Sequence, residues 1–175
     1  MIILIIIIGG YFLWQNKRKT IPPRVLKPIF NMEIKSPVFE NNTRFPAKYT
    51  CDGEGINPPL LISGVSPEAQ SLVLIFDDPD APAGTFTHWT VWNIDPKIKE
   101  IKENNVPEGA IEGMTDFGRS GYGGPCPSSG LHRYTFRLYS LDKKLDLGAG
   151  ARRAALEEAM NGHVLEEAKL IAPYS

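Results

Sequence analysis

The chain has 175 residues, enough for one domain with a substantial core and an additional tail. Its 19 lysines and arginines nearly balance its 20 aspartates and glutamates, so the overall charge does not favour a nucleic-acid partner, and we expect none. The 16 glycines and 15 prolines are spread along the chain, which favours a loop-rich β protein over a low-complexity one.

The first 16 residues are dominated by an apolar run. Residues 2–14 are almost wholly apolar, and Tyr11 and Trp14 resemble the aromatic residues found at membrane interfaces. The run is shorter than the roughly 20 residues of a spanning helix and closer in length to a signal-peptide core. It lacks the basic start and the small-residue cleavage site of such a peptide. We therefore interpret residues 1–16 as an uncleaved, single-pass N-terminal membrane anchor helix or signal-like segment.

Residues 17–31 form a basic, proline-rich linker that separates this segment from the rest of the chain. Basic residues directly after an anchor favour a cytoplasmic domain. The similarity of the short anchor to an export signal favours the other side. The sequence leaves the side of the membrane open, with a slight preference for an extracytoplasmic domain.

Residues 32–175 are expected to form the globular domain, which begins with strands. Apolar runs and alternating patterns predict strands over residues 32–36, 48–51, 58–62, 72–76 and 88–94. Residues 97–125 contain six glycines without a long periodic run, which predicts loops with short strands. From His132 to Leu138, apolar and aromatic residues alternate with polar ones, which predicts a strand that buries one face.

The sequence predicts helical structure in the C-terminal part of the chain. Residues 152–160 have a helical pattern that ends at Asn161-Gly162. Residues 164–171 suit either a second short helix or a helix-to-strand exit. The expected fold is mainly β, antiparallel, with short peripheral C-terminal helices.

An acidic corner follows the strand over residues 72–76. Asp77, Asp78 and Asp80 lie within four positions, and Pro79 and Pro82 stiffen the segment because proline fixes φ and lacks a backbone donor. The strand therefore ends in a rigid loop that carries carboxylates.

Two histidines, His88 and His132, stand at the starts of predicted strands, each after a rigid loop. If these strands are neighbours, an aspartate and two imidazoles meet at one end of the sheet. Backbone N–H groups of loop glycines and a ring from Trp89, Tyr122 or Tyr134 would complete the site. Imidazoles that donate when protonated, amide donors and apolar walls suit a small anion.

The same residues permit other interpretations. Two histidines and a carboxylate also form a known type of metal centre. Each histidine is equally explained as a hydrogen-bonded core residue. Nucleophilic catalysis is disfavoured because Ser128 and Ser129, although near His132, lack a Gly-x-Ser-x-Gly motif. We assign no role to His163.

The two cysteines, Cys51 and Cys126, allow one disulfide at most. Neither belongs to a Cys-x-x-Cys pair, so the sequence does not favour a zinc ribbon. A disulfide and two independent buried thiols are about equally compatible with the sequence.

Two segments resemble the signature motifs of the phosphatidylethanolamine-binding protein family. The first is Asp78-Pro79-Asp80-Ala81-Pro82 followed by His88, and the second runs from Gly124-Pro125 to Gly130-Leu131-His132-Arg133-Tyr134. Further segments resemble the bacterial and archaeal Raf kinase inhibitor-like branch of the family: Tyr49–Glu54, Asp116–Gly118, Gly121–Pro127 and the Gly162-His163 pair. The resemblance extends from about Met32 to Tyr174.

This resemblance implies a β-sandwich with a shallow anion pocket that takes phosphate or phosphorylated head groups. Carried over by position, it implies a lining of Asp78, His88 and His132, with a wall and floor shaped by Pro82, Gly124, Pro125 and Tyr134. It implies a binding or inhibitory module rather than an established enzyme, with no cofactor. A protease or a kinase is a possible class of partner, although the eukaryotic kinase role is not transferred.

The leading hypothesis is a membrane-tethered binding module for a phosphate-containing small molecule or lipid head group. One alternative is an inhibitor of a protease or kinase that acts through surface loops. Another is a metal-dependent enzyme that uses Asp78, His88 and His132. For the anion pocket, we expect affinity to weaken as pH rises past the histidine pKa, about 6.5 in peptides.

Overall fold

The computed structural model describes residues 31–175, so the predicted anchor (1–16) and nearly all of the linker (17–31) lie outside the described residues. The elements in chain order are β1 (Glu33–Lys35), the 3-10 helix η1 (Ala47–Tyr49), β2 (Leu60–Ser63), β3 (Ser71–Asp78), β4 (Phe86–Ile94), β5 (Glu100–Ile101), β6 (Ile111–Glu112), β7 (His132–Leu141), α1 (Arg153–Met160) and β8 (Val164–Tyr174).

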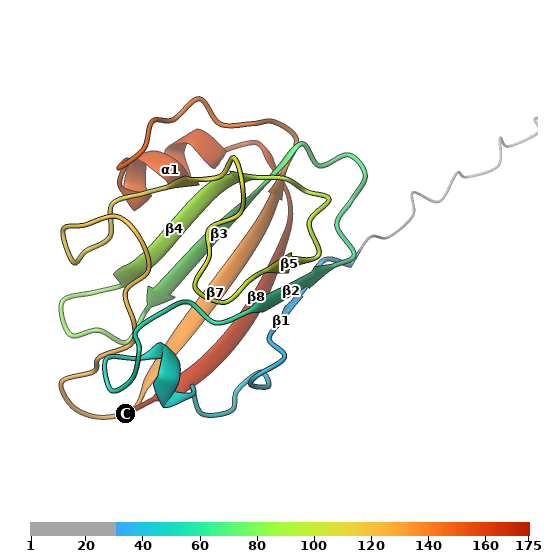
Figure 1. Cartoon of the computed structure of the whole chain (residues 1–175). Helices are drawn as coiled ribbons and strands as arrows, with labels where there is room; N and C mark the ends of the chain where they lie inside the picture. Colours follow the sequence, from blue (N-terminus) through green and yellow to red (C-terminus); the bar gives the residue numbers. More distant parts are fainter. Residues whose placement is uncertain (1–30) are drawn as a thin grey trace, which may run out of the picture.

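The strands form two antiparallel sheets, as Figure 1 shows. The smaller sheet has the order β1-β2-β5, and the larger has the order β6-β4-β3-β7-β8. Helix α1 covers part of the outer face of the larger sheet (Figure 1). The mainly β, antiparallel prediction is therefore confirmed.

The alternation of side chains along β3 divides the core into two layers. Leu72, Leu74 and Phe76 point toward the smaller sheet and join the main core. Val73 and Ile75 point the other way and pack with residues of α1. All eight residues of β3 are buried, as expected for a central strand with both faces covered. Burying one such apolar side chain contributes about 1.5–3 kcal/mol.

The strand predicted over residues 48–51 is wrong, because this segment turns instead of extending. The N–H of Tyr49 bonds the carbonyl of Pro46 at 3.0 Å, and that of Thr50 bonds the carbonyl of Ala47 at 3.1 Å. These bonds close η1. The turn is then packed tightly, since a Cβ on Gly53 would lie 2.3 Å from the Ala47 oxygen.

The plural C-terminal helices are also wrong, since residues 31–175 contain one α-helix. Residues 164–171 belong to β8, which pairs with β7 from Leu141↔Val164 to His132↔Tyr174. The predicted stop at Asn161-Gly162 is confirmed: Gly162 has φ 78°, and the chain then reverses into the strand. The long pairing with β7 selects the strand over the helix.

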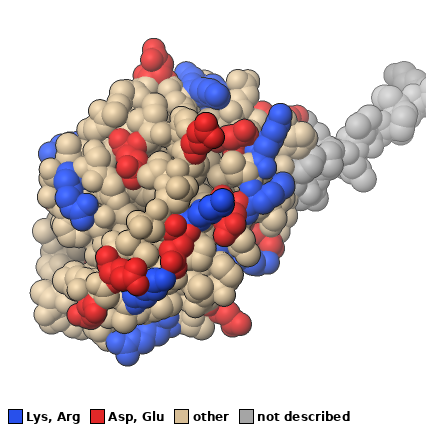
Figure 2. Space-filling model, viewed as in Figure 1, with Lys and Arg blue, Asp and Glu red and all other residues tan. Residues whose placement is uncertain are grey.

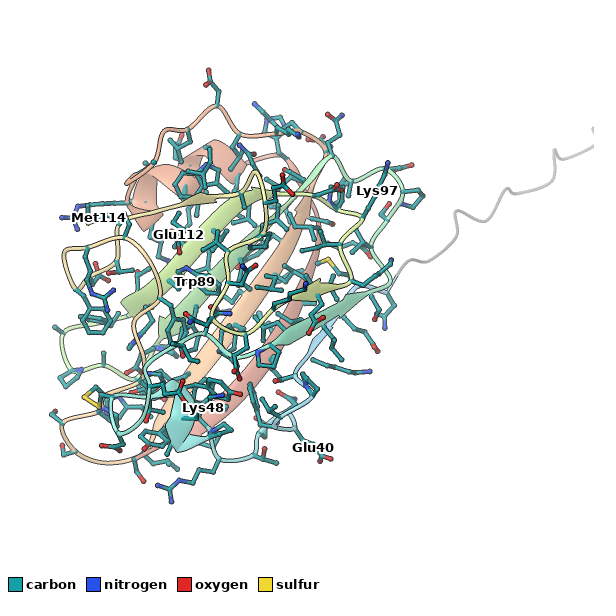
Figure 3. The ribbon with its side chains drawn as sticks, viewed as in Figure 1. Glu40, Lys48, Trp89, Lys97, Glu112 and Met114 are labelled. Carbon is teal, nitrogen blue, oxygen red and sulfur yellow. A yellow bond between two sulfur atoms is a disulfide. The ribbon has the colours of Figure 1, made fainter. Side chains whose placement is uncertain are left out.

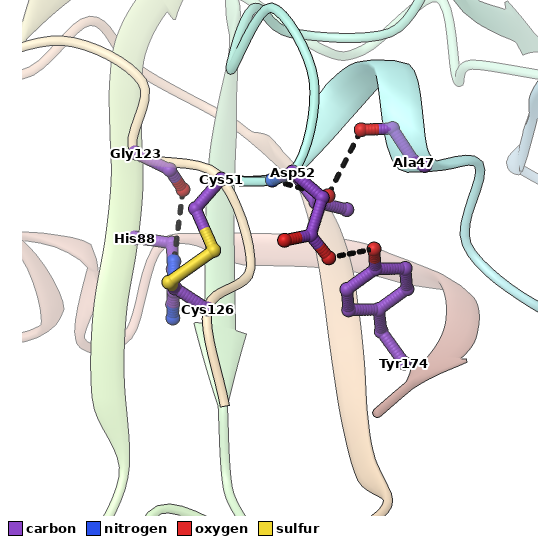
Figure 4. Close-up of a disulfide and its surroundings, with 8 residues drawn as sticks. Ala47, Cys51, Asp52, His88, Gly123, Cys126 and Tyr174 are labelled. Carbon is purple, nitrogen blue, oxygen red and sulfur yellow. Dashed lines mark hydrogen bonds between the residues drawn. A yellow bond between two sulfur atoms is a disulfide. The ribbon is translucent and has the colours of Figure 1, made fainter. Parts of the chain in front are cut away.

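Cys51 and Cys126 form a disulfide, with 5.4 Å between their Cα atoms. A backbone hydrogen bond of 3.0 Å from Cys51 N–H to the Pro125 carbonyl runs beside it. The disulfide thus joins the turn after η1 to the glycine-rich loop before β7 (Figure 4).

Within residues 31–175, no helix has the length and apolar character needed to cross a bilayer.

Candidate anion-binding site

The candidate site lies where β3 ends and β4 and β7 begin. The two histidine strands are not neighbours, because β3 lies between them in the sheet. Asp78, the last residue of β3, therefore stands between the strand that starts near His88 and the strand that starts at His132. A cavity of about 170 Å³ opens at this end of the sheet, and its lining is Asp78, Ala81, Pro82, Phe86, His88, Phe117, Cys126, Pro127, Ser128, His132 and Tyr134.

Asp78 and His132 form a buried ion pair. His132 Nδ1 lies 2.7 Å from Asp78 Oδ2, and the backbone N–H of Asp80 donates to Asp78 Oδ1 at 2.9 Å. The hydrogen bond to Asp78 raises the pKa of His132, and the Ser129 carbonyl adds to this effect. Because Nδ1 donates to the carboxylate, a protonated His132 carries its remaining donor on Nε2. Asp78 thus holds a cationic imidazole at the cavity.

His88 has a different environment. It is the extra residue of a β-bulge, since Phe76 pairs with Trp89 and Asp77 pairs with Thr87. Its Nδ1 lies 2.8 Å from the Gly123 carbonyl (Figure 4). A carbonyl oxygen only accepts, so Nδ1 donates there. Burial lowers the pKa of His88, which favours the neutral ring with an acceptor on Nε2.

Tyr134 lines the cavity, two residues after His132 on the same face of β7. Burial raises its pKa above the ordinary range, and the charge of Asp78 acts in the same direction. Its ring is 5.3 Å from the His88 ring in an edge-on arrangement. Tyr134 therefore presents a neutral hydroxyl.

Two aromatic residues that the sequence analysis did not select complete the wall. The rings of Phe86 and Phe117 lie 5.1 Å and 5.2 Å from the His88 ring. A Cβ on Gly123 would lie 2.2 Å from the Phe117 ring, so that glycine is required for the contact. The Asp116-Phe117-Gly118 segment was noticed as a family motif, and this motif was the signal that could have identified Phe117.

Of the seven predicted site residues, five line the cavity: Asp78, Pro82, His88, His132 and Tyr134. Gly124 and Pro125 lie outside the lining. Gly124 instead packs against the backbone of Thr50, where a Cβ would be 2.9 Å away. Gly124 and Pro125 therefore contact the turn after η1. A ligand-binding role for all seven residues stays a prediction.

Trp89 and Tyr122, which were also considered as ring partners, line a separate cavity of about 200 Å³. There the indole N–H of Trp89 donates to Glu112 at 2.6 Å, and Figure 3 shows these two side chains side by side. Of the three rings considered, Tyr134 is the one at the candidate site.

The aspartates of the acidic corner have separate partners. Asp80 receives the backbone N–H of Arg133 and two bonds from its guanidinium, at 2.9, 2.8 and 2.7 Å. This contact lowers the pKa of Asp80 to about 2. The fully buried Asp77 accepts from Arg137 and Arg153 on the opposite face of the sheet. Asp78 is therefore the one aspartate of the three that lines the cavity.

A larger cavity of about 590 Å³ lies between the sheet and the end of α1, next to Ile75, Tyr139 and Glu157. It is more than three times the volume of the candidate site but lies on the far face of β3 from the histidines. We place the site by its chemistry, because the smaller cavity holds the buried ion pair and both imidazoles.

The metal alternative gains no support from the geometry. Among residues 31–175, the histidine, cysteine and carboxylate side chains form no cluster of three that could hold a metal ion. Asp78 Oδ2 and His132 Nδ1 are bonded to each other.

These features define a phosphatidylethanolamine-binding type of domain: two antiparallel sheets with an Asp–His pocket at their end. The model of the phosphatidylethanolamine-binding protein family matches residues 35–175, and the chain belongs to this family. Its relatives place it in the bacterial and archaeal branch that includes the UPF0098 and YbcL-like proteins.

Sequence relatives come from several archaea. A UPF0098 protein of Methanothermobacter thermautotrophicus is 52% identical over 148 residues, which cover 82% of this chain and 98% of the relative. A UPF0098 protein of Pyrococcus horikoshii is 52% identical over 153 residues, covering 82% of this chain and 77% of the relative.

Solved structures show the same fold. The crystal structure of a phosphatidylethanolamine-binding protein homologue from Chlamydia trachomatis has a TM-score of 0.80 and 39% identity, covering 84% of this chain and 99% of that chain. Escherichia coli YbcL has a TM-score of 0.77 and 26% identity, covering 82% and 98%.

Proposed function

We propose that this chain is a binding module for small phosphate-bearing molecules, not an enzyme, and that the cavity beside Asp78, His88 and His132 is its pocket. The observation that carries the proposal is the buried Asp78–His132 pair, which keeps an imidazolium at the lining of a small cavity. A charged donor in a desolvated cavity attracts an oxyanion strongly.

The surroundings of the pocket support a small ligand. Its volume of about 170 Å³ is below the 300–1,000 Å³ of ordinary ligand pockets, so a phosphate with a short substituent fits it better than a large cofactor does. On the face shown in Figure 2, basic and acidic side chains are intermixed. Local donors in the pocket, rather than a broad basic surface, would therefore select the anion.

The test is a titration of the full chain with inorganic phosphate, followed by NMR. In the wild type, we expect NMR chemical-shift changes that cluster on Asp78, His88 and His132. His132→Gln removes the charged donor, which is worth about 1.5–3 kcal/mol, so phosphate affinity should fall by about ten- to a hundredfold.

His163→Gln is the matched control, because His163 also bonds an aspartate through Nδ1, at 2.9 Å from Asp142, but is exposed. This variant should bind phosphate like the wild type. Equal affinity in the His132 and His163 variants, or the absence of any shift in the wild type, would contradict the proposal.

We further propose that residues 1–16 tether the domain to a membrane, with the domain on the extracytoplasmic side. The Cys51–Cys126 disulfide supports that side, since disulfides persist in oxidising compartments, although proteins of hyperthermophiles also keep them inside the cell. Protease treatment of intact cells tests this: cleavage of the domain is expected, and protection until lysis would place it inside.

A further inference from the structure

The hydrogen-bonding roles of the two histidines restrict the ligand further than a requirement for negative charge does. Each ring uses Nδ1 as a donor inside the protein, His88 to the Gly123 carbonyl and His132 to Asp78. Nε2 is then the nitrogen that each ring can offer to a ligand, and the Ser129 carbonyl also interacts with the His132 ring. With the tautomers fixed in this way, the charge on each ring decides whether its Nε2 donates or accepts.

For His132 the neighbouring carboxylate favours the cation, so Nε2 donates. His88 is buried among the rings of Phe76, Phe86, Phe117 and Tyr134, which disfavour a charge, so Nε2 accepts. The two histidines therefore contribute one donor and one acceptor to the pocket.

This pattern matches one protonation state of phosphate. We propose that the pocket selects phosphate monoesters, bound as the monoanion, and discriminates against phosphodiesters. The monoanion of a monoester has an anionic oxygen to accept from His132 and a P–OH group to donate to His88. A diester has only acceptors and ester oxygens, so it would leave the buried His88 Nε2 without a donor.

This inference rests on the proposed anion pocket and names its ligand class. Leaving a buried acceptor unpaired costs about 1–3 kcal/mol, which corresponds to a loss of affinity on the order of tenfold or more. Asp78 cannot supply the missing proton, because its two oxygens accept from His132 and from the Asp80 N–H. The hydroxyls of Ser128 and Tyr134 also line the cavity, and that of Tyr134 interacts with Asp78. In the proposed complex, the ligand supplies the hydroxyl donor to His88.

The test uses two isomeric ligands, ethyl phosphate and dimethyl phosphate. They have the same atoms and, at about pH 5.5, the same predominant charge of minus one, since monoesters lose their second proton near pH 6. They differ in that ethyl phosphate keeps a P–OH group. We expect ethyl phosphate to bind the full chain at least about tenfold more tightly, measured by NMR titration of pocket resonances.

The outcomes separate the two proposals. If both isomers bind equally, the pocket takes anions but the monoester inference is wrong. If neither binds, the pocket proposal fails and the inference fails with it. Glycerophosphoethanolamine is a diester with an ammonium group, and binding as tight as that of ethyl phosphate would also overturn the inference, because the donor would then be nitrogen.

A variant tests the role of His88 directly. His88→Gln replaces a ring acceptor by an amide that can also donate, so dimethyl phosphate should gain relative to ethyl phosphate. An unchanged ratio in a variant that keeps the wild-type amide spectrum would remove His88 from the discrimination. If the variant does not fold, the isomer pair measured on the wild type still decides the question.

Discussion

At the scale of single residues, the pocket uses one residue type in two electrostatic states. The Asp78 carboxylate raises the pKa of His132, whereas burial lowers the pKa of His88. The sequence led us to expect that both imidazoles donate when protonated. The structure revises this expectation, because it gives the cationic role to His132 and the neutral role to His88.

These opposite shifts predict a specific pH dependence. His132 should titrate above 6.5 and His88 below it, measured by NMR of the ring protons. Phosphate affinity should fall as pH rises through the raised pKa of His132. The stability that His132 contributes is complete below 6.5 and is lost over the same rise, whereas that of His88 is lost as pH falls below 6.5.

Asp78→Asn should lower the pKa of His132 and weaken phosphate binding at neutral pH, because the carboxylate that favours the cation is gone. Asp142→Asn, at the exposed His163 pair, is the control and should leave both pocket histidines unchanged. A titration of His132 that is the same with and without the Asp78 carboxylate would refute this assignment.

At the scale of elements, the acidic corner joins β3 to two different parts of the fold. Asp77 is fully buried and binds Arg137 of β7 at 3.0 Å and Arg153 of α1 at 2.8 Å. Asp80 binds Arg133, whose side chain is 67% exposed. The first contact fixes the helix to the sheet, and the second fixes the loop beside the pocket.

This difference predicts unequal effects of the same substitution. Asp77→Ala should lower the free energy of unfolding by up to about 3–5 kcal/mol, because Arg137 and Arg153 lose their shared buried partner and keep only Glu167 and Glu157. Asp80→Ala should change stability much less, since exposed ion pairs contribute little. Urea unfolding of both variants measures this, and similar losses would contradict the assigned difference in burial.

The elements that the sequence predicted best are those whose pattern reflects burial directly. Strands β3, β4 and β7 show continuous or alternating apolar residues, and the predictions located all three. The segment of η1 was misassigned, and that of β8 was left open between a helix and a strand, because the apolar pattern of these two segments does not decide their conformation. The alternating pattern of Lys48–Cys51 is short, and the hydrogen bond to the Pro46 carbonyl makes this segment a turn. β8 is a strand because it pairs with β7 along its length.

The site shows the same division. Asp78, His88 and His132 could be selected because acids and imidazoles at strand ends are unusual. The position of β3 between the two histidine strands could not be predicted, because strand order depends on contacts between distant parts of the chain. Phe117 comes from a distant loop, and its contact with His88 depends on how Gly123 packs.

At the scale of the whole molecule, the described chain starts beside the smaller sheet, on the side of the domain away from the arrowhead of β3 (Figure 1). The backbone of Asn31 packs against Gly64, directly after β2, whereas the pocket lies at the end of β3, at Asp78. The eight residues of β3 span about 25 Å, given roughly 3.3 Å per residue. A tether at the N-terminus would therefore hold the domain by the end remote from its pocket.

The disulfide is the covalent link at the pocket end, and it predicts a stability that depends on redox state. Cys51 and Cys126 are 75 positions apart, and a disulfide typically stabilises a domain by about 2–4 kcal/mol, more for longer loops. A reductant should therefore lower the urea midpoint of the full chain. Because Cys126 lines the cavity, phosphate affinity should fall as well.

The double variant Cys51→Ala, Cys126→Ala separates this effect from other actions of the reductant. It should start from the lower midpoint and show no further change when reductant is added. If the wild type keeps its midpoint and its affinity after reduction, verified by mass measurement of the free thiols, the link does not stabilise the pocket end. In that case the 3.0 Å hydrogen bond from Cys51 to Pro125 and the packing of Gly124 on Thr50 suffice to hold the loop.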